Sequence, residues 1–242
     1  MKTILAGGAA ILASILAVAP ASAAGPATDG AFTFRLGGFF PSGDSEFWET
    51  NEAAFTLDHS DFDGVIGGVG YTASVNNHFE VGVNVDFYAA ESRSADRFYT
   101  DQDGFAILHD TRLDTIPMTA DFKILPAGRF ARRGADGSRY VRRPVPYLGV
   151  GVGLVYWKYE EEGDFVASDL SIVYDRLADS GLELEYHALV GIEFPVSPNW
   201  NITLEARQSW AEATPGGSFA VFDAGELDLG GTSVFVGGAL RF

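Results

Sequence analysis

The stretch from Phe79 to Ala89 constrains the fold more than any other part of this sequence. Its odd positions are apolar, and its even positions are mostly polar or glycine. A period of two is typical of a β-strand, in which successive side chains point to opposite faces. Eleven residues at ~3.3 Å each, tilted by ~40°, span roughly 25 to 28 Å, the height of the apolar band of a membrane β-barrel. The fold therefore depends on whether the apolar face meets a protein core or lipid.

Seven further segments show the same alternation, so the sequence predicts eight strands in all. Asn76 and Asn77 predict a tight turn, because asparagine tolerates positive φ. Pro117 cannot donate to a ladder, so a bulge or local gap is expected there. The predicted strands are 32–40, 65–75, 79–89, 115–124, 147–157, 182–194, 200–209 and 233–242.

The connections between these strands run long, short, long, medium, long, short, long. The long ones are polar and mostly acidic, and within the third of them Leu170 to Tyr174 could extend a hairpin. The medium one contains six arginines, which either contact anionic headgroups or are simply solvated. The long connections are 41–62, 90–112, 158–181 and 210–231; the arginines of 126–143 are Arg129, Arg132, Arg133, Arg139, Arg142 and Arg143.

The N-terminus predicts an export signal. Lys2 precedes a short apolar run, and Ala21-Ser22-Ala23 is a small-residue cleavage site. The predicted organisation is a signal peptide (1–23), a tether (24–30) and one β domain (31–242); an N-terminal membrane anchor is the alternative. The absence of cysteine excludes disulfides, thiolate metal sites and lipid attachment through cysteine. The formal charge of −17 argues against a nucleic-acid partner.

Two interpretations fit the alternation. In a soluble barrel or sandwich the apolar face is the core, whereas in a membrane barrel it meets lipid and the polar face fills the lumen. Mixed charges on the polar face and the alternating connection lengths favour the membrane barrel. So do small residues on the polar face, which a narrow lumen needs: Gly68, Gly70, Gly82, Gly149, Gly151, Gly153 and Gly191. Aromatic residues near strand ends match interfacial girdles: Phe32, Phe40, Phe79, Phe87, Tyr156, Phe194 and Trp200.

The export signal, the eight strands, the segment from Pro146 to Gly153 and the terminal Arg241-Phe242 together resemble small outer-membrane β-barrel proteins of the outer membrane protein A and W kind. The resemblance covers residues 31–242 and implies an all-β, eight-stranded antiparallel up-and-down transmembrane barrel in the outer membrane of a Gram-negative bacterium. It further implies contact with outer-membrane lipid and lipopolysaccharide. Phe242 matches the C-terminal aromatic residue that the barrel-assembly machinery reads in that family.

Eight strands leave a lumen just wide enough for side chains, so charges inside it are expected to pair across the strands. The expected network is Arg35, Glu80, Asp86, Asp121, Lys123, Glu193, Glu205, Arg207 and Arg241. A structural polar plug is the main hypothesis for it, with a surface-interaction role for the loops. A narrow gated channel is the alternative.

For catalysis the sequence offers little, and we expect no enzyme activity, cofactor or metal site. A lipid A-modifying enzyme, the third hypothesis, needs a serine, a histidine and an acid at the lipid face. The histidines are His59, His78, His109 and His187, and none is placed in a triad by sequence. Whether the acidic loops bind divalent cations stays open, since 101–104 lacks the later ligands of a calcium loop.

Overall fold

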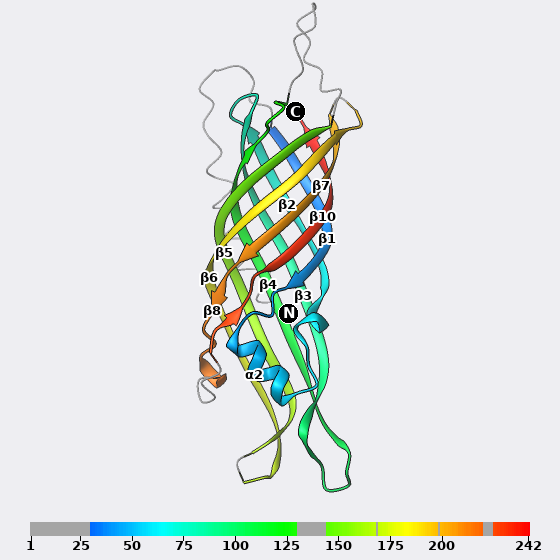
Figure 1. Ribbon diagram of the computed structural model, residues 1–242, viewed down its shortest axis with the longest axis vertical. Coiled ribbons are helices and arrows are strands. Elements are labelled where there is room, and N and C mark those ends of the chain that lie inside the picture. The colour runs from blue at the N-terminus through cyan, green and yellow to red at the C-terminus, as the bar shows by residue number, and fades with distance from the viewer. Residues whose placement is uncertain (1–29, 130–143, 168, 198, 220–224) are drawn as a thin grey trace, which may run out of the picture.

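The computed structural model describes residues 30–129, 144–167, 169–197, 199–219 and 225–242 (Figure 1). Eight antiparallel strands form a closed barrel in the order β1-β10-β7-β6-β5-β4-β3-β2, which confirms the predicted fold class. The strands are β1 (Gly30–Pro41), β2 (Gly64–Ser74), β3 (Phe79–Thr100), β4 (Ala106–Ile124), β5 (Val145–Val166), β6 (Ile172–Pro195), β7 (Trp200–Trp210) and β10 (Gly231–Arg241).

The predicted signal peptide lies outside the described residues, as does the predicted tether apart from Gly30, which begins β1. Five of the six arginines predicted in the medium connection, Arg132, Arg133, Arg139, Arg142 and Arg143, also lie outside them. Among the described residues, no helix is both long and apolar enough to cross a membrane.

Side chains alternate between the exterior and the lumen as the period of two predicts. In β3, Val81 and Phe87 are 43% and 52% exposed, whereas Glu80 and Asp86 are each 1% exposed. The lumen needs its glycines because the walls are close. A Cβ at Gly151 would lie 2.3 Å from the His187 ring, nearer than real Cβ atoms come.

The proline of β4 leaves a gap in the ladder and no bulge. Partners are formed at Val85–Met118 and Tyr88–Thr115, but not at the two positions between them, where Pro117 lies. The register is the same on both sides, so the missing N–H interrupts pairing without shifting it. The register shift in this hairpin lies further out, between Ala95 and Thr100.

Four strands are much longer than predicted and extend far beyond the other four at one end (Figure 1). The predictions of connections at 90–112 and 158–181 are wrong, because most of these residues continue β3, β4, β5 and β6. Outside the apolar band the outward face becomes charged, so the apolar alternation that marks a strand in sequence is lost. Only the expected extension near Leu170–Tyr174 was foreseen; Leu170 itself is in the turn, with φ 65°. The outer sheet, as we call it, consists of β3 after Tyr88, β4 before Thr115, β5 after Trp157 and β6 before Gly181.

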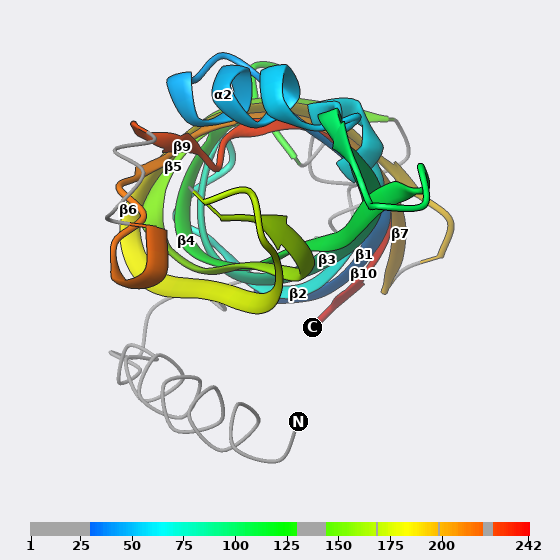
Figure 2. The same ribbon diagram turned by 90° about the horizontal axis from the view of Figure 1, so that it is seen from below.

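The described parts of the first and fourth long loops fold against the inner face of the outer sheet, and we call residues 41–63, 211–219 and 225–230 the cap. It contains α2 (Glu46–Ala54), η1 (His59–Phe62), β8 (Glu212–Ala213), η2 (Gly217–Phe219) and β9 (Leu227–Asp228). Ser45 caps α2 by accepting a hydrogen bond from the N–H of Trp48 at 3.4 Å. Figure 2 shows α2 along the rim of the barrel. This helix was not predicted from the sequence.

Candidate functional site

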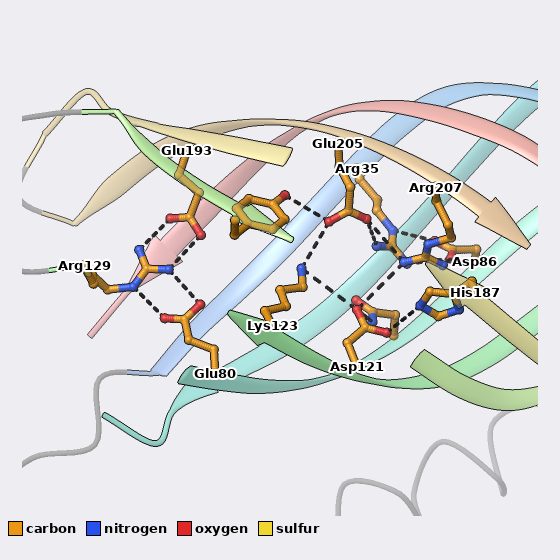
Figure 3. Close-up of polar contacts among 12 residues, drawn as sticks. Arg35, Glu80, Asp86, Asp121, Lys123, Arg129, His187, Glu193, Glu205 and Arg207 are labelled. Carbon is orange, nitrogen blue, oxygen red and sulfur yellow. Dashed lines mark hydrogen bonds and ion pairs between the residues drawn. The ribbon is translucent and has the colours of Figure 1, made fainter. Parts of the chain in front are cut away.

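An ion-pair cluster occupies the middle of the lumen (Figure 3). Arg35 of β1 donates hydrogen bonds to the Asp86 carboxylate of β3 from Nε at 2.7 Å and from Nη2 at 2.5 Å. Its Nη1 lies 3.2 Å from Glu205 of β7. Arg207 of β7 joins the same two carboxylates at 3.1 and 3.3 Å. All four residues are at most 8% exposed. The cluster therefore joins β1, β3 and β7 across the barrel.

The same cluster continues to the opposite wall through β4 and β6. Lys123 Nζ lies 3.1 Å from Glu205, and Asp121 accepts a hydrogen bond from Asn84 Nδ2 at 2.8 Å. His187 Nε2 lies 3.0 Å from Asp121, and its Nδ1 lies 3.4 Å from Glu185. No sequence argument had linked His187 to the network, although the period of two places it on the inward face of β6.

A second cluster closes the end of the lumen where the short turns lie. The guanidinium of Arg129 bonds Glu80 at 2.5 and 2.7 Å and Glu193 at 2.7 and 2.9 Å. Arg241 Nη2 lies 3.5 and 3.4 Å from the same two carboxylates. Figure 3 shows Arg129 between Glu80 and Glu193. One cation from a turn thus bridges strands β3 and β6, which lie three places apart in the barrel.

Arg129 is the main residue of this site that sequence reasoning misplaced. It was expected in a solvated turn or at headgroups, but it is 1% exposed inside the barrel. Its N–H donates to Asn77 O at 2.8 Å, and Gly128 before it has φ 66°, which turns the chain inward. The one signal was an excess of acids, since the nine expected lumen residues carry five negative and four positive charges.

All nine expected residues point into the lumen, and the structure brings them together in these two clusters. The space left between them is small, about 20 Å³, and is lined by Arg35, Lys123, Glu205 and Arg241 among others. This volume suits about one water molecule. Between the two clusters the lumen is therefore largely filled by side chains.

An aromatic core fills the other end of the lumen beneath the cap. The ring of Tyr159 lies 5.0 Å from Phe47 and 5.5 Å from Phe219, so β5 contacts both cap loops. Trp48 is fully buried and donates through Nε1 to Asp228 O at 3.3 Å, which ties the first loop to the fourth. Inward residues of the barrel wall, including Phe235, join the same cluster. Phe47, Trp48, Phe62 and Phe219 of the cap are buried, whereas most of its described acids are exposed.

Glu161 is a buried acid within this outer region. It lies on the inward face of β5, outside the apolar band, since its outward neighbours Glu160 and Glu162 are charged. Burial raises the pKa of its carboxyl to about 7, and the hydrogen bond from the Tyr159 hydroxyl at 2.7 Å offsets this only in part. No described cation forms an ion pair with it.

One serine–histidine pair bears on the hypothesis of a lipid A-modifying enzyme. Ser94 Oγ lies 2.9 Å from His109 Nε2, and both residues are 2% exposed on the inward face of the outer sheet. Nδ1 of His109 has no hydrogen-bond partner among the described residues, so no acid orients the ring. A lipid-modifying triad needs that acid and access to lipid. This pair has neither.

In the acidic loops, the carboxylates that could bind a cation already make hydrogen bonds within the protein. The carboxylate of Asp101 accepts hydrogen bonds from the N–H groups of Asp103 at 3.0 Å and Phe105 at 2.7 Å, which stabilises the β3–β4 turn. In the cap, ligand atoms of Glu52, Asp58 and His59 lie within 4.8 Å of one another, but His59 Nδ1 already contacts Glu52 at 2.9 Å. That contact raises the pKa of His59.

No family model and no curated protein sequence matches this chain. Solved structures match its fold. Outer membrane protein OprG from Pseudomonas aeruginosa matches with a TM-score of 0.51 at 11% identity, over 89% of this chain and 96% of that one. Neisserial surface protein A matches with a TM-score of 0.44 at 12% identity, over 88% and 97%. Ail, the attachment invasion locus protein of Yersinia pestis, solved in complex with the heparin analogue sucrose octasulfate, gives 0.42 at 14% identity, over 90% and 100%.

The fold is that of a small eight-stranded barrel of the bacterial outer membrane, and the resemblance expected from the sequence is confirmed at this level. The exterior agrees with it, because Phe34, Leu36, Val150 and Val236 are each at least 57% exposed on the outward face. An apolar belt of this kind is stable in hydrocarbon and not in water. The chain is an integral outer-membrane barrel. In small outer-membrane barrels short turns lie at the periplasmic end and long loops at the extracellular end, and we name the two ends of this barrel by that rule.

Proposed function

We propose that this protein is a sealed outer-membrane barrel that acts through its extracellular outer sheet and cap, and not by conducting solutes. The observation that carries the proposal is the filling of the lumen at three levels. Arg129 bridges Glu80 and Glu193 at the periplasmic end, the Arg35–Asp86 cluster fills the middle, and the aromatic core lies under the cap. A role at the surface is then what remains for the extracellular third of the chain.

The lumen network is structural in this proposal. Each buried guanidinium has carboxylate partners, which offsets the cost of removing charge from water. Contacts with lipopolysaccharide and recognition of Phe242 by the barrel-assembly machinery belong to the same proposal. Phe242 is 62% exposed, with its ring 5.6 Å from Phe32 on the outer surface, where another protein can reach it.

The alternative, a narrow gated channel, has one observation in its favour. Arg129 comes from a turn and not from a strand, so it can leave the lumen without unpairing the barrel. Against it, the middle cluster is carried by strands and the aromatic core is held by two loops. An enzymatic role has no such support, because the Ser94–His109 pair is buried and lacks an acid.

Single-channel recording in planar bilayers tests the proposal. Wild-type protein is expected to give no discrete unitary current over the physiological pH range. Folding is checked in the same preparation by the shift in gel mobility between unheated and heated samples. A well-defined unitary current from the folded protein would overturn the sealed barrel and favour the channel.

A further inference from the structure

The outward face of the outer sheet contains a hollow of about 510 Å³ with an acidic lining. Five carboxylates line it: Glu91, Asp110, Glu160, Glu162 and Asp164. Two arginines also line it, but both are engaged by aspartates, one of them by Asp110 at 2.7 and 2.8 Å. Glu160 pairs with Lys158 and Arg176, and Glu162 lies 3.6 Å from Arg176. Glu91 and Asp164 form no ion pair with a described residue. The hollow therefore presents unneutralised negative charge beside the ring of Tyr174.

Strand β6 borders this hollow and ends in a free sheet edge. β7 pairs with β6 only from Tyr186 to Pro195, so the residues before Tyr186 have β5 on one side alone. The cap covers this edge near Asp179, whose carboxylate accepts a hydrogen bond from the N–H of Gly216. From Ile172 to Leu177, β5 is the one described strand that pairs with β6, and its other edge is free.

The hydrogen-bond alternation shows which backbone groups this edge offers. Ala167 N–H donates to Ser171 O, so the next pair, Val166 and Ile172, is of the non-hydrogen-bonded kind. Even-numbered residues of β6 thus direct their N–H and C=O away from β5. The N–H of Arg176 is taken by the Asp175 carboxylate at 2.7 Å. Ile172 and Tyr174 remain with both backbone groups directed at solvent.

The side chains along this edge are also unusual for a free strand. Ile172, Val173 and Tyr174 are 40%, 47% and 65% exposed. An exposed apolar edge is the surface to which an extended segment adds as a new strand, with backbone bonds giving affinity and side chains giving specificity. Two copies of this chain would bring two acidic hairpins together, and the chain carries a net charge of −17. Charge therefore favours a basic partner over a second copy.

We propose that the outer sheet binds an extended cationic segment of another protein, which pairs with Ile172 and Tyr174 of β6 and directs lysine or arginine toward Glu162 and Asp164. The cross-strand partner of Tyr174 is Asp164, so ring and carboxylate lie together on the outward face. A cation there is attracted by both. This inference rests on the proposed surface role and names the partner's chemistry.

A peptide-binding measurement on the folded barrel in zwitterionic nanodiscs tests this inference. The probe is a labelled eight-residue peptide of alternating lysine and valine, followed by fluorescence anisotropy. One control peptide alternates glutamate and valine, and a second is the lysine peptide N-methylated at every residue. The lysine peptide is expected to bind, and both controls are expected to bind at least about tenfold more weakly, as the loss of one or two hydrogen bonds or of charge pairing implies.

Variants locate the binding. Tyr174→Pro removes the side chain and an outward N–H but no backbone bond to β5, and Tyr174→Thr removes the ring and its hydroxyl bond to Glu162 but keeps the N–H. Glu162→Gln with Asp164→Asn removes charge at the hollow, and Asp101→Asn with Asp103→Asn removes the same charge at the other hairpin. The proline variant and the hollow pair are expected to weaken binding about tenfold, the threonine variant less, and the distant pair not at all. Heat-dependent gel mobility confirms folding in each case.

Three outcomes would overturn the inference: no binding of the lysine peptide, equal binding of its methylated form, or insensitivity to both the proline variant and the hollow pair. Disulfide crosslinking of Tyr174→Cys between copies in vesicles would also overturn it, in favour of self-association. None of these results bears on conductance, so failure here is distinguishable from failure of the sealed-barrel proposal.

Discussion

Arg129 and Glu193 are joined by hydrogen bonds of 2.7 and 2.9 Å, although one lies in a periplasmic turn and the other on β6, 64 residues further along the chain. The same guanidinium holds Glu80, so two buried carboxylates depend on one cation from outside the strands. Arg241 is near but makes longer contacts. The periplasmic end of the lumen is therefore closed by a side chain that the strand pattern does not supply.

Removing that cation should be costly. Arg129→Ala leaves Glu80 and Glu193 buried without their bidentate partner, and breaking a buried pair in this way costs about 3–5 kcal/mol. Arg129→Lys should recover only part of this, because an ammonium cannot bond both carboxylates in the bidentate manner. Urea unfolding in lipid vesicles measures the loss. Combining Arg129→Ala with Glu80→Gln and Glu193→Gln should restore most of the stability; an Arg129→Ala variant as stable as wild type would show that the bridge is not needed.

The outward face of β3 can be tested by placing a charge in lipid. Val83 lies on that face and pairs with Ala120 of β4. Val83→Arg should lower barrel stability by about 2–4 kcal/mol, the cost of arginine near mid-membrane. Asp103→Ala, in the exposed β3–β4 turn, is the control and should be nearly silent. Equal unfolding curves for the two variants would contradict the facing of β3.

The sequence predicted the barrel well because lipid imposes a simple rule on it. Where strands cross the apolar band, outward positions must be apolar, and residues such as Phe34 and Val236 reveal the period of two. Beyond the band no such rule applies, so β3 at Arg93 and β5 at Glu160 read as loop although they remain in strands. Helix α2 was missed for a related reason: only Phe47 and Trp48 in its first turn are apolar and buried, too few to show a helical period.

The charge network of the lumen could also be predicted only in part from the sequence. Strand periodicity placed Arg35, Asp86 and Glu205 on the inward face, but it cannot tell which charges lie at the same height in the barrel. That depends on register and on strand tilt, which arise only when the ring closes. Arg129 lies outside any strand, so only the charge imbalance of the lumen pointed to it.

The buried acid of the outer sheet predicts a pH dependence of the cap. The folded-state pKa of Glu161 is about 7, above its ordinary value of 4.5. The folded state thus binds the proton more tightly than the unfolded state, so the contribution is favourable below pH 4.5 and is lost as pH rises to about 7. The loss is on the order of 3 kcal/mol. Hydrogen exchange in the described parts of the cap, corrected for intrinsic rates, should show it.

The variant Glu161→Gln isolates this effect, because it keeps the size of the side chain and cannot ionise. Protection of the cap in this variant should no longer fall between pH 5 and pH 8. Glu162→Gln, on the exposed outward face, is the matched control and should keep the wild-type slope. If wild type and Glu161→Gln lost protection in parallel, another group would be responsible.

The cap should come loose without unfolding the barrel. Trp48 is fully buried between the two cap loops, and Trp→Ala in a core costs about 3–5 kcal/mol. Trp48→Ala should therefore expose residues 41–63 and 211–219 to limited proteolysis, while heat-dependent gel mobility stays that of a folded barrel. Thr50→Ala, exposed on the same helix, should leave proteolysis unchanged. Unfolding of the whole barrel by Trp48→Ala would show that the cap and barrel form one cooperative unit.

The central claim is that apolar side chains face lipid while charged ones are enclosed. Since the chain has no cysteine, single cysteines from Leu182 to Phe194 in β6 can each carry a spin label whose access to oxygen and to a water-soluble nickel complex is measured in vesicles. Accessibility to oxygen in the bilayer should alternate strictly, with even positions accessible and odd positions protected. Oxygen access that does not alternate, or that favours odd positions, would contradict it.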